Sequence, residues 1–194
     1  MMRWPAEPFG FIYLASLFII TVIRSGNIAV IRSGLTFSLD TVLLTLMFIS
    51  MGIIPILFIF SPLLDVFNYR LPFYFGIPGT LLIIFSQLIL YKAHSDLGKN
   101  WSITPQILKN QHLVTEGIYK YLRHPMYASY WLWSLSQPLL LENWVAGFAT
   151  LAVYAPLYYY RVHREERLMI EEFDGAYEMY MKKTNRLWPK IKTG

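Results

Sequence analysis

The chain has 194 residues, of which 55% are hydrophobic and only 15% are charged, and its mean hydropathy is +0.39. A soluble domain carries about 25% charged residues, so this apolar excess predicts an integral membrane protein. The absence of cysteine excludes disulfides, thiolate metal ligands and a cysteine nucleophile. The net charge of +5 is modest and indicates basic cytoplasmic loops rather than a nucleic-acid surface.

Five apolar segments have about the length that a membrane-crossing helix needs, which is roughly 20 residues. They are residues 9–23, 39–60, 71–91, 125–141 and 144–160. Pro55 predicts a kink in the second segment. Only Glu142 and Asn143 join the fourth segment to the fifth, which predicts a tight antiparallel hairpin. The start of the chain lacks the pattern of a cleaved signal peptide.

The distribution of basic residues predicts the orientation of these segments. If the C-terminus is cytoplasmic, the cytoplasmic parts are 24–38, 92–124 and 161–194, and only Arg3 and Arg70 of the 17 lysines and arginines fall outside them. The expected fold is therefore all-α, a polytopic membrane protein with five transmembrane helices. A cytoplasmic connecting loop and an amphipathic C-terminal helix complete a single membrane domain over residues 1–194, with its N-terminus outside.

Apolar residues recur at helical spacing after the fifth segment and predict the amphipathic tail helix, which either continues that segment or lies beside it. They are Val162, Met169, Ile170, Phe173, Tyr177, Tyr180 and Met181. On this helix Glu165 heads an otherwise apolar row, with Arg161 one turn before it. Glu166 also borders the apolar face, so the choice between the two glutamates stays open. Such groups at membrane depth are functional candidates, although a weak surface ion pair has the same spacing.

Two further blocks precede the fourth segment. In HLVTEGIY, residues 112–119, polar residues flank a short apolar run, and Gly117 follows it. This pattern is compatible with a loop that binds a polar ligand and with an ordinary cytoplasmic loop. In RHPMY, residues 123–127, Pro125 suits the first turn of a helix. Arg123 and His124 would then lie at a helix N-terminus, which attracts anions. Anchoring at the membrane surface is the alternative, and it explains His124 less well.

The three blocks 112–119, 123–127 and 164–183, in this order, resemble the isoprenylcysteine carboxyl methyltransferase family, and more widely the integral-membrane methyltransferases that include phospholipid N-methyltransferases. The resemblance covers about residues 97–189, which would form the cofactor-binding and catalytic part. It implies S-adenosylmethionine as the methyl donor. The residues that would line the cofactor are Gln111, His112, Leu113, Val114, Tyr119, His124, Pro125, Met126, Tyr127 and Glu165. Arg161 would face the substrate carboxylate, and Ser129 stands where the family often has glycine.

Carboxyl methylation fits these residue types. A carboxylate is ionised at neutral pH, so the reaction needs no general base. The reaction removes two charges, so a water-poor site at the membrane edge favours it. Arg161 would orient the substrate carboxylate, His124 would hold the carboxylate of the cofactor, and Glu165 would hold its amino group or position Arg161. The expected acceptor is a prenylated cysteine, on a protein or as a small molecule, that enters from the bilayer.

Two alternatives stay open. A methyltransferase acting on a phospholipid or other lipid amine would need a base, which Glu165 or Glu166 could supply. A non-enzymatic membrane scaffold would use the polar blocks only to dock a partner. The four histidines are scattered and HExxH is absent, so no metal site is expected, and neither a P-loop nor a GxGxxG after a strand is present.

Overall fold

The computed structural model describes residues 8–25, 39–98 and 112–190, and within these residues it is helical, with two isolated β-bridges. The longer elements are α1 (Phe9–Ser25), α2 (Leu39–Phe48), a π-helical turn (Ile49–Ile53), α3 (Ile54–Phe60), α4 (Gly76–Leu97), α5 (Pro125–Leu141) and α6 (Trp144–Lys183). Short 3-10 turns lie at Pro62–Phe67, Phe73–Phe75 and Gly117–Lys120. The predicted all-α fold is confirmed for this part of the chain.

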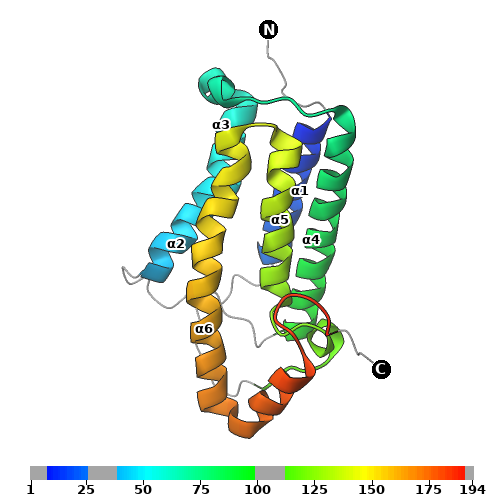
Figure 1. The fold of residues 1–194 in the computed structure, drawn as a ribbon, viewed down its shortest axis with the longest axis vertical. Helices are drawn as coiled ribbons and strands as arrows, with labels where there is room; N and C mark the ends of the chain where they lie inside the picture. The colour runs from blue at the N-terminus through cyan, green and yellow to red at the C-terminus, as the bar shows by residue number, and fades with distance from the viewer. Residues whose placement is uncertain (1–7, 26–38, 99–111, 191–194) are drawn as a thin grey trace.

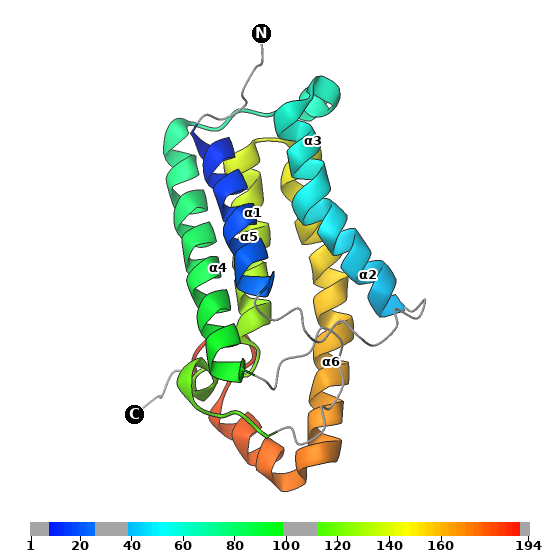
Figure 2. The ribbon, with the colours of Figure 1, turned by 180° about the vertical axis from the view of Figure 1, so that it is seen from behind.

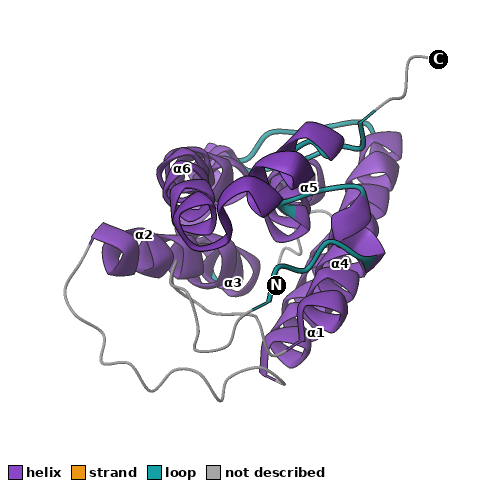
Figure 3. Ribbon diagram, turned by 90° about the horizontal axis from the view of Figure 1, so that it is seen from below, coloured by secondary structure: helices purple, strands orange, loops and turns teal. Residues whose placement is uncertain are grey.

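The helices run side by side along the long axis of the molecule (Figure 1). α5 packs between α4 and α6, α1 packs against α4 and α5, and α2 and α3 lie against α6. The view along the helices shows α1 and α4 on one side and α2 and α3 on another, joined through α5 and α6 (Figure 3). The reverse view shows that the last part of α6 and the chain after it fold back beneath the bundle (Figure 2).

The α5–α6 hairpin forms as predicted. Pro125 is the first residue of α5, where its missing amide has no partner to lose. The Asn143 side chain caps α6 by accepting hydrogen bonds from the backbone amides of Val145 (3.0 Å) and Ala146 (2.9 Å). The two helices approach closely at Gly147, where a Cβ atom would lie 2.8 Å from the Cα of Pro138. A larger side chain at this position would force the hairpin open.

The segment with the predicted kink at Pro55 contains a wider helical turn. The π-helical turn at Ile49–Ile53 directly precedes α3, whose second residue is Pro55. A π turn frees backbone carbonyls from the regular helical ladder. Side chains of α5 and α1 bind two of them, since Gln137 Nε2 donates to Ser50 O (3.2 Å) and Tyr13 Oη donates to Met51 O (2.7 Å). Pro55 is therefore accommodated by a change of helical pitch that ties three helices together.

The third predicted segment overlaps an observed helix but differs from it at both ends. We expected residues 71–91, but α4 runs over Gly76–Leu97. Pro72 has an extended backbone and delays the helix, whereas Pro78 is tolerated within its first turn. At the other end an ion pair between Lys92 and Asp96, one turn apart, supports polar residues beyond the apolar run (2.5 Å).

The fifth predicted segment and the tail helix form one element, α6, of 40 residues. At 1.5 Å per residue it is about twice as long as the roughly 30 Å hydrocarbon core of a membrane. Its only non-helical residue is Asp174 (φ 44°, ψ −131°). The chain turns there, and the following stretch buries Tyr177 and Tyr180. The apolar row predicted on one straight helix is therefore interrupted after Phe173.

Two helical stretches, Leu39–Phe60 and Phe73–Leu97, are long and apolar enough to cross a membrane by length and composition. Phe48, Phe60 and Phe85 are more than half exposed on these stretches, as expected for side chains that face lipid. α1 is apolar but shorter, and α5 has 17 residues. The prediction of five spans is thus supported for two of them, and the other three stay predictions.

Candidate functional site

Three of the predicted site residues, His124, Tyr127 and Glu165, lie in contact at the end of the bundle where α5 begins. Glu166 is buried there and binds three basic side chains. Its carboxylate accepts hydrogen bonds from Arg123 Nε (3.0 Å) and Arg186 Nη2 (2.5 Å), and His124 Nε2 lies 3.3 Å from it. Burial alone would raise the pKa of the Glu166 carboxyl, but the hydrogen bonds from His124, Arg186 and Arg123 hold that pKa well below its ordinary value. Glu166 is therefore the centre of a buried ionic cluster.

The chain after α6 completes this cluster. The backbone amides of Arg123 and His124 donate to the carbonyls of Asn185 (2.9 Å) and Arg186 (3.0 Å). The Arg123 side chain also donates to the carbonyl of Thr184. The returning segment, residues 184–186, is thereby fastened to the residues that lead into α5. Sequence reasoning overlooked Arg186, because its position depends on the turn at Asp174.

Glu165 has different surroundings. Its side chain is 29% exposed, and Tyr127 Oη donates a hydrogen bond to it. His124 Nδ1 lies 3.8 Å from the second oxygen, so the imidazole stands between Glu165 and Glu166. The structure therefore distinguishes the two glutamates that the sequence left open. Glu166 is enclosed by cations, whereas Glu165 keeps one accessible face beside Tyr127.

Arg161 is buried one turn before Glu165 and pairs with a residue from α2. Its Nε lies 3.2 Å from Asp40 Oδ1, and Arg164 Nη1 lies 2.5 Å from Asp40 Oδ2. Sequence reasoning did not single out Asp40, which was counted within an apolar segment. The available signal was its charge, since a carboxylate at the end of such a segment requires a cationic partner.

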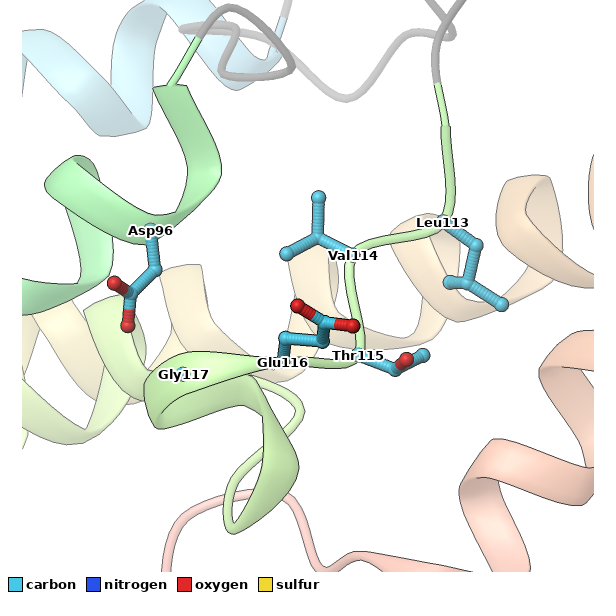
Figure 4. Close-up of a pocket in the computed structure, with 6 residues that line it drawn as sticks. All are labelled: Asp96, Leu113, Val114, Thr115, Glu116 and Gly117. Carbon is cyan, nitrogen blue, oxygen red and sulfur yellow. The ribbon is translucent and has the colours of Figure 1, made fainter.

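The loop before α5 forms a pocket of about 390 Å³ with the end of α4, lined by Asp96 and residues 113–117 (Figure 4). Gly117 has φ +60°, and a Cβ atom there would lie 2.1 Å from Asp96 Oδ2. The same oxygen accepts a hydrogen bond from the Ile118 amide (2.7 Å), which fixes the loop on α4. The predicted residues Leu113 and Val114 line this pocket, and Glu116 adds a carboxylate to it.

The other predicted residues lie elsewhere in the loop before α5 and in the first turn of α5. His112 is exposed, Tyr119 is buried, and Pro125 and Met126 lie in the first turn of α5. Gln111 lies outside the described residues. Within residues 8–25, 39–98 and 112–190, no group of three or more His, Asp or Glu side chains is placed to hold a metal ion.

Residues 79–171 match the model of the isoprenylcysteine carboxyl methyltransferase (ICMT) family. This range contains the loop, the start of α5 and both glutamates. The resemblance to the ICMT family is confirmed. The protein-S-isoprenylcysteine O-methyltransferase of Schizosaccharomyces pombe is 30% identical over 121 residues, which are 60% of this chain and 51% of that protein. The Homo sapiens enzyme of the same name is 28% identical over 119 residues, 60% of this chain and 42% of that protein.

A solved structure shows a similar fold. The eukaryotic intramembrane Ras methyltransferase ICMT aligns with a TM-score of 0.57 at 21% identity, over 92% of this chain and 62% of that one. The chain spans about half the length of the curated ICMT relatives it matches. The similarity of fold therefore extends into the N-terminal helices, beyond the part that matches the family model.

Proposed function

We propose that this chain is an integral-membrane methyltransferase that uses S-adenosylmethionine to methylate the carboxylate of a prenylated cysteine, on a protein or as a small acceptor. The names of its ICMT relatives support the reaction. The observation that carries the proposal is the arrangement on α6, where the buried Arg161 lies one turn before the partly exposed Glu165. One end of the bundle thus presents a cation for an acceptor carboxylate beside an anion for a cationic donor.

The residues present fit the donor. S-adenosylmethionine carries an ammonium group, a sulfonium, a carboxylate and a nucleoside, and when bound it supplies an electrophilic methyl group. The accessible face of Glu165 would receive the ammonium group, with Tyr127 holding that carboxylate in place. Leu113 and Val114 would contact the donor from the loop pocket. The anion-binding role predicted for His124 stays a prediction, and here the imidazole also separates the two glutamates.

Arg161 would bind and orient the acceptor carboxylate. A guanidinium has donors on its planar edges that match the two oxygens of a carboxylate. Burial at 7% exposure excludes most of the water that would otherwise solvate both charges. The carboxylate needs no general base, so the chain supplies alignment and a dry environment. We favour carboxyl methylation over methylation of a lipid amine because Arg161 would bind a carboxylate and because this reaction needs no base.

We further propose that the chain crosses the membrane five times, with its N-terminus outside and its C-terminus in the cytoplasm. α1, α5 and the first 17 residues of α6 would be the three additional spans. Phe18 (72% exposed) and Val22 (53% exposed) support this for α1, because they present apolar surface where lipid would lie. The acceptor would arrive through the bilayer, and the donor would arrive from the cytoplasm.

The direct test uses the full chain purified in detergent with donor labelled in the methyl group. A prenylcysteine acid, phosphatidylethanolamine and an unprenylated cysteine acid are the three acceptors. We expect base-labile label, typical of a methyl ester, on the prenylcysteine acid alone. Label on phosphatidylethanolamine instead would establish the lipid-amine alternative. If calorimetry detected no saturable binding of S-adenosylhomocysteine, both methyltransferase hypotheses would be refuted and the non-enzymatic scaffold would be the remaining hypothesis.

A further inference from the structure

Asp40, on α2, pairs with two arginines of α6, Arg161 and Arg164. Its side chain is 6% exposed, in the first turn of α2, and it contacts two arginines that project from α6. Arg161 Nε is 3.2 Å away and Arg164 Nη1 is 2.5 Å away. Residues 79–171 match the family model, so Asp40 lies outside that match while touching a residue inside it.

We propose that Asp40 is a positioning residue that orients Arg161 toward the acceptor carboxylate, with Arg164 compensating the charge of Asp40. The inference rests on the proposed function, since it deepens the role of Arg161. The charges support it, because two guanidinium groups and one carboxylate give this trio a net charge of +1. An acceptor with one carboxylate would therefore make the trio neutral.

The alternative partners available to Arg161 explain why it needs a positioning group. An arginine side chain has many rotamers, and one turn along the same helix stands Glu165, at the i,i+4 spacing of helical ion pairs. A shift of Arg161 onto Glu165 would take the cation from the acceptor and the anion from the donor at once. Asp40 approaches from another helix and forms an ion pair with Arg161, with its Oδ1 3.2 Å from Nε, which draws the guanidinium toward α2.

Arg164 has a separate part in this arrangement. With Arg161 alone, Asp40 would form a neutral pair, and an incoming carboxylate would meet no net positive charge. The Arg164 side chain is 48% exposed, so water solvates part of its charge at low cost. It can therefore neutralise Asp40 without entering the site. The same geometry yields a rival hypothesis, in which Asp40 occupies Arg161 as a competitor of the acceptor.

The test compares Asp40→Asn, Asp40→Glu and Arg164→Ala with the unmodified chain, using the prenylcysteine acid as acceptor and S-adenosylhomocysteine for calorimetry. Loss of the buried ion pair with Asp40 would leave Arg161 less well oriented, so we expect a roughly tenfold higher KM for the acceptor in Asp40→Asn, with a much smaller change in kcat. Asp40→Glu should recover part of this loss, and Arg164→Ala should also raise KM. Binding of S-adenosylhomocysteine should change less than about twofold in each, since no donor contact is removed.

Asp65→Asn is the matched control, because it removes a carboxylate from the 3-10 turn Pro62–Phe67 at the other end of the bundle. An unchanged KM in Asp40→Asn would overturn the inference, and a lower KM would establish competition instead. Parallel loss of donor binding and thermal stability in all three variants would reduce Asp40 to a packing residue. If the unmodified chain failed to methylate the prenylcysteine acid, the proposed function would fail first, and its failure is thus distinguished from that of the positioning role.

Discussion

Arg161 and Glu165 lie one helical turn apart, yet their surroundings differ. Arg161 is buried against Asp40, whereas Glu165 has a face open to a ligand. Their proposed roles are therefore separable by substitution. Arg161→Ala should abolish carboxyl methylation and leave the affinity for S-adenosylhomocysteine largely intact. Arg161→Lys keeps the charge but lacks the planar donor edge, so we expect at least a roughly tenfold loss of kcat/KM. Equal loss of turnover and donor binding would contradict the role assigned to Arg161.

The adjacent glutamates offer a matched pair of isosteric changes. Glu165→Gln should weaken S-adenosylhomocysteine binding about tenfold, the usual effect of losing a charged hydrogen bond, and should leave the unfolding midpoint nearly unchanged. Glu166→Gln should reduce the free energy of unfolding by about 3 kcal/mol, because it leaves buried cations without their carboxylate. Calorimetry and thermal unfolding in the same detergent measure both effects. The reverse assignment of the two effects would show that Glu166 is the residue facing the donor.

The ionic cluster also predicts a dependence of stability on pH. The pKa of Glu166 is lowered in the folded protein from its ordinary value of 4.5, by its hydrogen bonds to His124, Arg186 and Arg123, which outweigh burial. A depressed carboxyl pKa stabilises the folded state above the unfolded-state value, and the contribution is lost as the pH falls below it. The unfolding midpoint should therefore drop below about pH 4.5. In Glu166→Gln this part of the pH dependence should be absent, and an unchanged profile would place the titrating group elsewhere.

The loop that carries residues 112–119 depends on one backbone conformation. Gly117 adopts φ +60°, and its missing side chain admits the Asp96 carboxylate that binds the Ile118 amide. Gly117→Ala should displace the loop from α4 and weaken S-adenosylhomocysteine binding several-fold, because a left-handed alanine costs about 1–2 kcal/mol before any clash. Gly175→Ala is the control, since a Cβ atom there has nothing within 4 Å. Equal affinities in the two variants would exclude the loop pocket from donor binding.

The helices differed in how well their sequences predicted them. The predicted segment agrees with α5, because Pro125 marks the start of the helix and the short connection to α6 marks its end. The segment predicted for α4 lies closer to the N-terminus than the helix does. Hydropathy follows only the apolar run, whereas the helix also includes polar residues that a local ion pair stabilises. The turn at Asp174 interrupts an otherwise helical pattern. The Asp174–Gly175 dipeptide, a common turn signal, could have predicted it.

Within the site, local contacts were more predictable than contacts between distant helices. The sequence singles out His124, Tyr127 and Glu165 because they belong to short blocks with a recognisable pattern, and the structure brings them into contact, while their roles stay predictions. The pairing of Asp40 with Arg161, and of Glu166 with Arg186, depends on how α2 and the end of the chain pack onto α6. Periodicity describes which face of a helix is apolar, but it does not specify which distant residue meets that face. These contacts consequently required the structure.

The absence of cysteine makes the proposed five-span topology directly testable. Val66, 81% exposed in the turn after α3, would lie outside the cell, whereas Glu178, exposed in the last part of α6, would lie in the cytoplasm. Single Val66→Cys and Glu178→Cys variants should react differently with a membrane-impermeant maleimide. We expect Val66→Cys to react in intact cells and Glu178→Cys only after permeabilisation. Both side chains are exposed, so neither substitution should alter the packing of the helices. The proposed topology places three spans between the two positions, so labelling of both from the same side would contradict it. The orientation predicted from the lysines and arginines would then also be wrong.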